Sequence, residues 1–318
     1  MKFLKATPTH IQEAAQAIRA GDIVAFPTET VYGLGADVFN PVACAKIFEA
    51  KQRPQFDPLI VHVESPTQVE KLASTISPRV KILIDKFWPG PLTLILPKRL
   101  EVPSIVTAGL DTVAVRMPSH PIAIALIKAA GTPIAAPSAN PFGYLSPTTA
   151  KHVRNQLGDR VSIILNGGAC PIGVESTIIK MGDPPVLLRP GGLPLEDIEQ
   201  EIGKLAIANP VASAPEAPGQ LKTHYSPRTP FILARPSTPL PRGKNIGYLS
   251  FKKPTHKLPV TKLEVLSETG DLREAAANLF TCLHRLDEAG VDIIVAETVP
   301  EEGLGRAIMN RLYKAASQ

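Results

Sequence analysis

The chain has 318 residues, of which 44% are apolar and 20% charged, and its formal net charge is +5. A chain of this length buries a large core without staples, which excludes the small scaffolds that depend on disulfides or metal ions. The positive charge is local, because residues 206–262 hold nine Lys/Arg and ten Pro but a single acid, Glu216. A nucleic-acid coat would spread its charge over a whole domain face, so the composition argues against one.

The cysteine pattern and the N-terminal residues indicate the cellular compartment of the protein. Cys44, Cys170 and Cys282 lie more than 100 residues apart, so they form neither a zinc motif nor a disulfide framework. The first ten residues, MKFLKATPTH, lack the apolar run of a signal peptide, and no stretch has the ~18 apolar residues of a membrane helix. We therefore expect a cytoplasmic protein with no membrane partner.

The first two thirds of the chain alternate between helical and strand patterns. Residues 9–20 favour a helix, with Thr9 and Gln12 as a capping box and Gly21 at its end. Strands are predicted at 22–27, 58–63, 92–97, 112–117, 133–136, 161–165, 176–181 and 185–189, and helices at 41–51, 66–73, 77–87, 121–130, 148–157 and 194–204. Only a turn separates Met181 from Pro185, so some strands must be antiparallel. The pattern predicts an α/β domain with a twisted mixed sheet.

After Ile207 the sequence becomes rich in Pro, Ala and Ser, which is typical of an extended, solvent-exposed connector. Strand patterns at 231–234, 246–249 and 292–299 and helical patterns at 271–289 and 304–316 then indicate a second, small α/β unit. The predicted organisation is a domain over 1–205, a Pro-rich linker over 206–229 and a small domain over 230–318.

The common nucleotide-binding motifs are missing from the sequence. There is no GxxxxGKS/T, and Gly33-Leu34-Gly35 is followed by Val38 where a dinucleotide fingerprint has its third glycine. Polar clusters instead fall at the ends of predicted strands, where open α/β sheets bind their ligands. They are PTETVYGLG (27–35), KQRP (51–54) with Asp57, Thr112 to Arg116, APSAN (136–140) with Ser146, EST (175–177) and LRPG (188–191).

Three of these clusters suggest a ligand chemistry. The hydroxyls and glycine amides of 27–35 suit a small zwitterion or a phosphate. Lys51 and Arg53 suit a polyphosphate, and Arg116 lies among apolar neighbours and needs an anion. Each cluster alone is equally compatible with a turn or a helix end, so the argument depends on their order along the chain.

In that order the clusters resemble the threonylcarbamoyl-adenylate synthases, in the form with a YrdC-like catalytic domain, a linker and a small Rossmann-like C-terminal domain. PTETVYGLG, KQRP before PLIVHV, TVAVRMP, APSAN, STI and LRPG follow the family's order, and LKTHYSP matches its linker. The resemblance implies a nucleotidyltransferase that makes L-threonylcarbamoyl-AMP and pyrophosphate from L-threonine, bicarbonate or CO2, and ATP with Mg²⁺. It also implies that the product passes to t6A-transfer proteins that modify adenosine 37 of tRNA, with tRNA as a further candidate partner.

The resemblance also assigns residues to the two substrates. It places L-threonine near Thr30, His62, Arg116, Ala136 and Ser176. It places ATP near Lys51, Arg53, Asp57, Thr112, Ser138, Asn140, Ser146, Arg189 and Tyr225, and it implies no metal ion held by the protein alone. Lys51 and Arg53 are expected to act electrostatically in catalysis, and Arg116 offers a planar fork for the threonine carboxylate. Asp57 stands where the family has Asn, and a carboxylate there would act through Mg²⁺, an amide or the ribose.

The implied chemistry needs no covalent enzyme intermediate, so catalysis would come from alignment and electrostatic stabilisation. His62 is a candidate general base. The block Lys222-Thr223-His224-Tyr225 is expected to close over the nucleotide. Two alternatives stay open: RNA binding by the basic segment, which has few interleaved aromatics, and carbamoyl transfer, as in a module of hydrogenase-maturation proteins whose acylphosphatase and zinc-finger segments are missing here.

Overall fold

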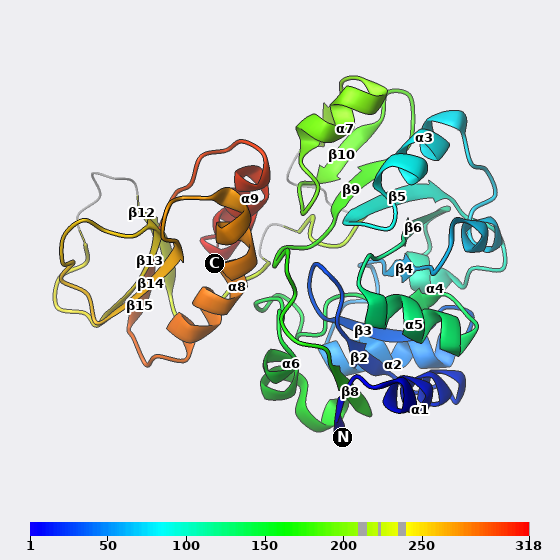
Figure 1. Cartoon of the computed structure of the whole chain (residues 1–318), viewed down its shortest axis with the longest axis horizontal. Helices are drawn as coiled ribbons and strands as arrows, with labels where there is room; N and C mark the ends of the chain where they lie inside the picture. The colour runs from blue at the N-terminus through cyan, green and yellow to red at the C-terminus, as the bar shows by residue number, and fades with distance from the viewer. Residues whose placement is uncertain (209–214, 222–223, 235–239, 318) are drawn as a thin grey trace.

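The computed structural model describes residues 1–208, 215–221, 224–234 and 240–317 of the chain. It contains a large unit (residues 1–208), a connector (residues 215–221 and 224–229) and a small unit (residues 230–234 and 240–317), and Figure 1 shows the two units side by side. Lys222 and Thr223 of the predicted closing block lie outside the described residues. None of the helices in the described ranges combines the length and hydropathy needed to cross a bilayer.

The large unit is built on one mixed sheet. Over the described residues its eleven strands run in the order β1-β8-β2-β3-β7-β4-β6-β5-β9-β10-β11. The strands are β1 (Lys2–Lys5), β2 (Val24–Phe26), β3 (Gly33–Asp37), β4 (Ile60–His62), β5 (Leu92–Pro97), β6 (Thr112–Arg116), β7 (Ile134–Ala135), β8 (Ile163–Asn166), β9 (Thr177–Lys180), β10 (Val186–Arg189) and β11 (Ala206–Ile207). β4 and β6 are parallel, whereas β5 and β6 and also β9 and β10 are antiparallel. The predicted mixed sheet is confirmed, including the antiparallel turn after Met181.

Helices cover the two faces of this sheet unequally. They are α1 (Pro8–Arg19), α2 (Pro41–Lys51), α3 (Pro78–Phe87), α4 (Ser104–Thr107), α5 (Pro121–Ala130), α6 (Ala150–Leu157) and α7 (Leu195–Ile202), with the 3-10 helices η1 (Pro66–Lys71) and η2 (Gly158–Arg160). α2, α3, α6 and α7 pack on one face, whereas α1 and α5 pack on the other over β2, β7 and β8. On that second face Ile60, Ala114 and Ile178 are covered by Ala217 of the connector instead of a helix. This is the face on which a ligand can approach the sheet.

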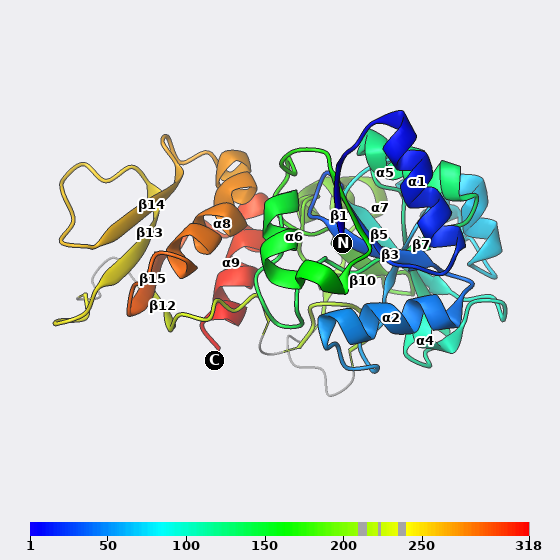
Figure 2. The same ribbon diagram turned by 90° about the horizontal axis from the view of Figure 1, so that it is seen from below.

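The small unit has a four-stranded sheet, β12-β15-β13-β14, whose paired strands are all parallel. Its elements are β12 (Phe231–Ala234), β13 (Ile246–Lys252), β14 (Lys262–Ser267), α8 (Leu272–Asp287), β15 (Ile293–Glu297) and α9 (Leu304–Ala315). α8 and α9 lie between this sheet and the large unit (Figures 1 and 2). One apolar cluster joins the two units, because it contains Val31, Leu145 and Val174 as well as Leu279 and Phe280 of α8.

Several local predictions need correction. The predicted capping box at Thr9 is wrong, because α1 begins at Pro8 and its N-cap is Thr7, which accepts a hydrogen bond from the His10 amide. The helix predicted at 66–73 is the 3-10 helix η1, and the strands β1, β3, β11 and β14 were not predicted. By contrast, α2 and α5 have the bounds that the sequence predicted.

The connector is less exposed than the sequence predicted. In its described part Ala217, Gln220, His224 and Tyr225 are all buried. They are buried because the connector takes the place of a helix on the apolar face of the large sheet. Residues 206–207, predicted as the start of the linker, form β11 and pair with β10. The domain bounds 1–205, 206–229 and 230–318 otherwise stay predictions.

Candidate functional site

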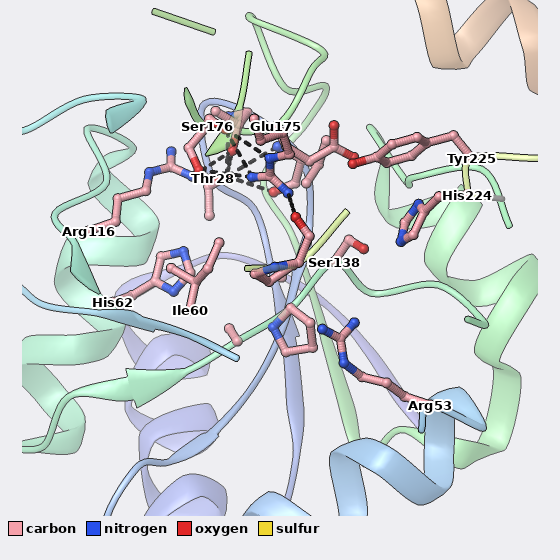
Figure 3. Close-up of a pocket in the computed structure, with 17 residues that line it drawn as sticks. Thr28, Arg53, Ile60, His62, Arg116, Ser138, Glu175, Ser176, His224 and Tyr225 are labelled. Carbon is pink, nitrogen blue, oxygen red and sulfur yellow. Dashed lines mark hydrogen bonds between the residues drawn. The ribbon is translucent and has the colours of Figure 1, made fainter. Parts of the chain in front are cut away.

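A pocket lies on the face of the large sheet that α1 and α5 leave uncovered. It is lined by the 28–33 loop, by β4, β6 and β10, by the 136–138 turn and by the connector. Figure 3 shows Arg116 and His62 on one side of it and His224 and Tyr225 on the opposite side. The empty space in the pocket and its open mouth, solvent included, is about 510 Å³, but the enclosed cavity itself is only about 40 Å³.

Arg116, the last residue of β6, lines one end of the pocket. Its guanidinium lies 2.6 Å from the Glu29 carboxylate and donates to the Thr30 hydroxyl at 2.8 Å and the Gly90 carbonyl at 3.2 Å. Burial opposes ionisation of Glu29, but Arg116 outweighs it and holds the pKa of Glu29 below its ordinary value. A guanidinium has five N–H groups, so these contacts orient Arg116 and leave two N–H groups for a ligand.

His62, at the end of β4, lies beside Arg116. Its ring packs edge-on against Phe26, with the ring centroids 6.1 Å apart, and its Nδ1 has no hydrogen-bond partner among the described residues. Burial and the nearby Arg116 charge lower the pKa of His62 to about 3. The imidazole is therefore neutral near pH 7 and suited to hydrogen bonding, and so low a pKa argues against the role of general base.

Arg53 and Asp57 form a buried ion pair at another edge of the pocket. Their side chains approach to 2.9 Å, and both are almost inaccessible to solvent. Arg53 also donates to the carbonyls of Asp57 and Pro58. Arg53 lines the pocket, whereas the Asp57 carboxylate faces the Arg53 guanidinium. Asp57 therefore orients Arg53, and its contact with Mg²⁺, an amide or the ribose stays a prediction.

Lys51, the last residue of α2, lies behind the pocket wall. Its ammonium donates to the carbonyls of Ser138 and Asn140, each at 2.5 Å, and the side chain is 1% exposed. Burial and the nearby Arg53 lower its pKa well below the ordinary value. The Asn140 amide in turn donates to the Tyr144 carbonyl at 2.8 Å. Lys51 and Asn140 thus fix the turn that presents Ser138 to the pocket.

The opposite end of the pocket is formed by Arg189 and the connector. Arg189 donates to the Ser176 carbonyl at 3.0 Å and to the Pro218 carbonyl at 3.2 Å. Tyr225 is 1% exposed, and its backbone has φ of 60°, a region that an aromatic residue seldom adopts. Its hydroxyl lies beside the Arg189 guanidinium, which interacts with it. A buried tyrosine with a strained backbone is typical of a functional site.

The structure brings most of the predicted site residues together. The residues predicted to bind threonine all line the pocket: Thr30, His62, Arg116, Ala136 and Ser176. Of the predicted ATP residues, Arg53, Ser138, Arg189 and Tyr225 line it too. Lys51, Asp57, Asn140 and Ser146 each bond to a residue that does or to one another. Thr112 lies at the other end of β6 from Arg116, four residues away, or about 13 Å along a strand.

Two acids next to predicted residues were given no role by the sequence. Glu29 pairs with Arg116, and Glu175 lines the pocket and accepts a hydrogen bond from Ser146. The sequence feature that could have identified both acids is their position inside the PTET and EST clusters. In the described ranges no group of three or more His, Cys, Asp or Glu side chains could hold a metal ion.

Comparisons with known proteins extend this picture. A Sua5/YciO/YrdC family model, described as "Telomere recombination", matches residues 16–191, and a model described as "Threonylcarbamoyl-AMP synthase, C-terminal domain" matches residues 193–317. The threonylcarbamoyl-AMP synthase of Pyrococcus abyssi is 48% identical over 96% of this chain and 94% of its own length. That of Bacillus subtilis is 43% identical over 98% and 94%. The crystal structure of P. abyssi Sua5 complexed with L-threonine has a TM-score of 0.92 at 43% identity, covering 99% of this chain and 97% of that one.

Proposed function

The chain belongs to the Sua5/YrdC family of threonylcarbamoyl-AMP synthases, in the form with a C-terminal domain, and on that premise we propose how it works. It catalyses the formation of L-threonylcarbamoyl-AMP and pyrophosphate from L-threonine, bicarbonate or CO2, and ATP, for t6A modification of tRNA. The observation that carries this function is the identity above 40% to such synthases over nearly the whole chain. That match favours synthesis over both RNA binding and carbamoyl transfer.

Threonine binds at the Arg116 end of the pocket. The two N–H groups that Arg116 keeps free form a fork for the substrate carboxylate. Thr30 and Ser176 place hydroxyl groups beside that position, and neutral His62 offers a hydrogen bond without a competing charge. The P. abyssi relative was crystallised with L-threonine, which supports L-threonine as the substrate of this pocket.

ATP binds at the other end, where Arg53 and Arg189 face the pocket. These two cations offset the triphosphate charge, and Ser138 and Tyr225 supply hydroxyl contacts. Lys51, Asp57, Asn140 and Ser146 act through the neighbours they hold, while Thr112 remains a predicted ATP contact on the same face of β6 as Arg116. Mg²⁺ enters bound to ATP and neutralises part of the phosphate charge. The Asp57 carboxylate is already paired with Arg53, so the chain contributes little to holding the ion.

The reaction then proceeds by alignment of bound groups. The threonine amine attacks CO2 and loses a proton to water, which gives a carbamate. A carbamate oxygen attacks the α-phosphorus, and the bond from that phosphorus to the pyrophosphate oxygen breaks. Arg53 and Arg189 stabilise the charge that develops on the leaving group. The connector covers the pocket and excludes water from the labile mixed anhydride.

The proposal also covers the fold of the small unit, the cellular location and the downstream partners. The parallel four-stranded sheet with α8 and α9 on one face supports a Rossmann-like description of the small unit. Cys44, Cys170 and Cys282 are all free and buried, which is compatible with a cytoplasmic location. The product is unstable in water, so proteins that transfer it to tRNA are the expected downstream partners.

An omission assay tests the proposed function. Purified protein is incubated with Mg²⁺-ATP, L-threonine and bicarbonate, and pyrophosphate and threonylcarbamoyl-AMP are measured by phosphate-coupled absorbance and mass spectrometry. Both products should form together, and omitting either threonine or bicarbonate should abolish both. Pyrophosphate release at the full rate without threonine, or no threonylcarbamoyl-AMP with every substrate present, would contradict the proposal.

A further inference from the structure

Two cations of α9 in the small unit are buried against the large unit and the connector. Arg311 is 0% exposed and Lys314 is 8% exposed. Burying a charged side chain is costly unless it is paired and hydrogen-bonded. The partners of these two residues therefore show what α9 is built to hold.

Arg311 holds groups at the nucleotide end of the pocket. Its Nε and Nη2 lie 2.9 Å and 2.8 Å from the same Glu175 oxygen, and its Nη1 donates to the Pro190 carbonyl at 2.6 Å. Its guanidinium also lies over the ring of Tyr225, 5.0 Å from the centroid. The other Glu175 oxygen accepts a hydrogen bond from Ser146. One side chain of the small unit thus contacts both the connector and the loop that lines the pocket.

Lys314, one turn further along α9, holds the connector itself. Its ammonium donates to the carbonyls of Gly219 and Leu221, at 2.6 Å and 2.7 Å. Gly219 lies against the Tyr225 hydroxyl so closely that a Cβ on Gly219 would come within 2.6 Å of it. The side of α9 that carries Arg311 and Lys314 therefore packs against the wall that Tyr225 forms.

The negative charge on Glu175 would oppose nucleotide binding if Arg311 did not neutralise it. Burial opposes ionisation of Glu175, but Arg311 and Arg189 outweigh it, so the pKa of Glu175 lies below its ordinary value. A carboxylate that lines the nucleotide end of the pocket repels a triphosphate unless a cation neutralises it. Arg189 also bonds to Ser176 and Pro218, whereas Arg311 makes the direct ion pair with Glu175.

We propose that Arg311 is a positioning residue of the active site, supplied by the small unit, which neutralises Glu175 and supports Tyr225 so that the pocket accepts an adenine nucleotide. It acts through these two residues and not by touching the reacting atoms. The inference rests on the proposed function for the identity of the nucleotide. It gives the small unit a role in substrate binding, exerted through Glu175 and Tyr225.

The test compares Arg311→Met with a matched control on the same helix. Arg306→Met also breaks an ion pair from α9 to the large unit, with Glu196, but that pair is partly exposed and lies outside the pocket lining. Loss of a charge-assisted contact predicts that R311M raises the Kd and KM for ATP by about 10- to 100-fold, with the KM for threonine close to wild type. R306M should leave both constants near wild type.

A double variant separates electrostatics from misfolding. R311M leaves the buried Glu175 carboxylate without its ion-pair partner, whereas R311M/E175Q removes that charge as well, so the double variant should recover much of the lost ATP affinity. Melting temperatures of all variants report on folding. The inference is overturned if R311M has the melting temperature and the Kd for ATP of wild type. It is also overturned if R311M/E175Q has the melting temperature of wild type but the same raised Kd for ATP as R311M.

Equilibrium titration with ATP alone keeps this test independent of the reaction. A wild-type protein that binds ATP but makes no threonylcarbamoyl-AMP overturns the proposed function. The role of Arg311 would then still be decided by the ATP affinities of wild type, R311M and the double variant.

Discussion

The two ends of the pocket are assembled from different parts of the chain. The proposed threonine end consists of Glu29, Thr30, His62 and Arg116, which all belong to the large unit and are held by strand ends and one ion pair. At the nucleotide end the large unit supplies Arg53 and Glu175, the connector supplies Tyr225, and α9 supplies Arg311. The first end is complete within one unit, whereas the second requires three parts of the molecule to be docked together.

The docking surface shows how the second end is held in place. Val31, Leu145 and Val174 of the large unit share an apolar cluster with α8 and α9. Polar contacts surround it, including the Tyr144 hydroxyl with Asp287 at 2.5 Å and Thr148 with Thr281 at 3.0 Å. Because the connector and α9 are fixed by this surface, variants that disturb docking should affect ATP more than threonine.

Arg116→Ala is expected to have the largest effect and to fall on the threonine end. It removes the predicted partner of the substrate carboxylate, so kcat/KM for threonine should fall by about 30- to 1,000-fold, which corresponds to about 2–4 kcal/mol. ATP affinity should survive. Pyrophosphate release at varied threonine measures the effect, and Arg79→Ala, an exposed arginine paired with Asp183, is the matched control. Lost ATP affinity with unchanged threonine use would reverse the assignment of the two ends.

Lys51→Met should act on the nucleotide end. It removes the ammonium that holds the Ser138 and Asn140 carbonyls, so kcat/KM for ATP should fall by about 10- to 100-fold. Lys46→Met is the control, because Lys46 lies on the same helix but bonds to Gly21 and Asp22. A threonine defect equal to the ATP defect would show that the turn serves both ends.

Tyr225→Ala should uncouple the reaction by exposing the nucleotide to water. Pyrophosphate release without threonylcarbamoyl-AMP should rise several-fold, while Tyr225→Phe, which keeps the ring over Arg311, should stay better coupled. The ratio of pyrophosphate to product, measured in one reaction, reports the coupling. Wild-type coupling in Tyr225→Ala would mean that the connector only tethers the two units.

The smallest expected effect concerns docking at acidic pH. The rings of His152 on α6 and His284 on α8 lie 4.1 Å apart, and burial lowers the pKa of His152 to about 3 and that of His284 to about 4. In the unfolded chain a histidine has a pKa near 6.5, so it binds a proton at a pH where the buried histidine stays neutral. The contribution of these histidines to the free energy of unfolding is therefore fully present above about pH 6.5. It decreases below that pH, by up to about 1.4 kcal/mol per pH unit for His284.

Melting temperatures between pH 7.5 and pH 5 measure this loss. His284→Gln should flatten the pH dependence, and His256→Gln, in an exposed loop of the small unit, should leave it as in wild type. An unchanged slope in His284→Gln would show that other groups cause the acid sensitivity.

The sequence predicted the local features of the fold because their causes are local. α2 and α5 each begin at a proline and have clear end signals, and their bounds were predicted correctly. β3 was not predicted, because Gly33–Asp37 has no β-branched residues and is extended only by its pairing with β2 and β7. The burial of the connector likewise depends on a sheet face formed by residues distant in sequence.

The site shows the same division between local and distant causes. Arg116 was predicted because it ends a strand among apolar neighbours, and Lys51 and Arg53 because they lie at the end of a helix. That Lys51 points to the 138–140 turn follows from a contact across 89 residues, and the Arg311–Glu175 contact spans 136. No spacing rule in the sequence connects such pairs.

The most direct test of the two-ended pocket is to measure the KM for threonine and the KM for ATP side by side in Arg116→Ala and Arg311→Met. The structure predicts a crossed pattern, in which Arg116→Ala raises mainly the threonine KM and Arg311→Met raises mainly the ATP KM. If both variants raise both constants by the same factor, the threonine end and the nucleotide end are not built separately, and the assignment of Arg116 and Arg311 to different ends is wrong.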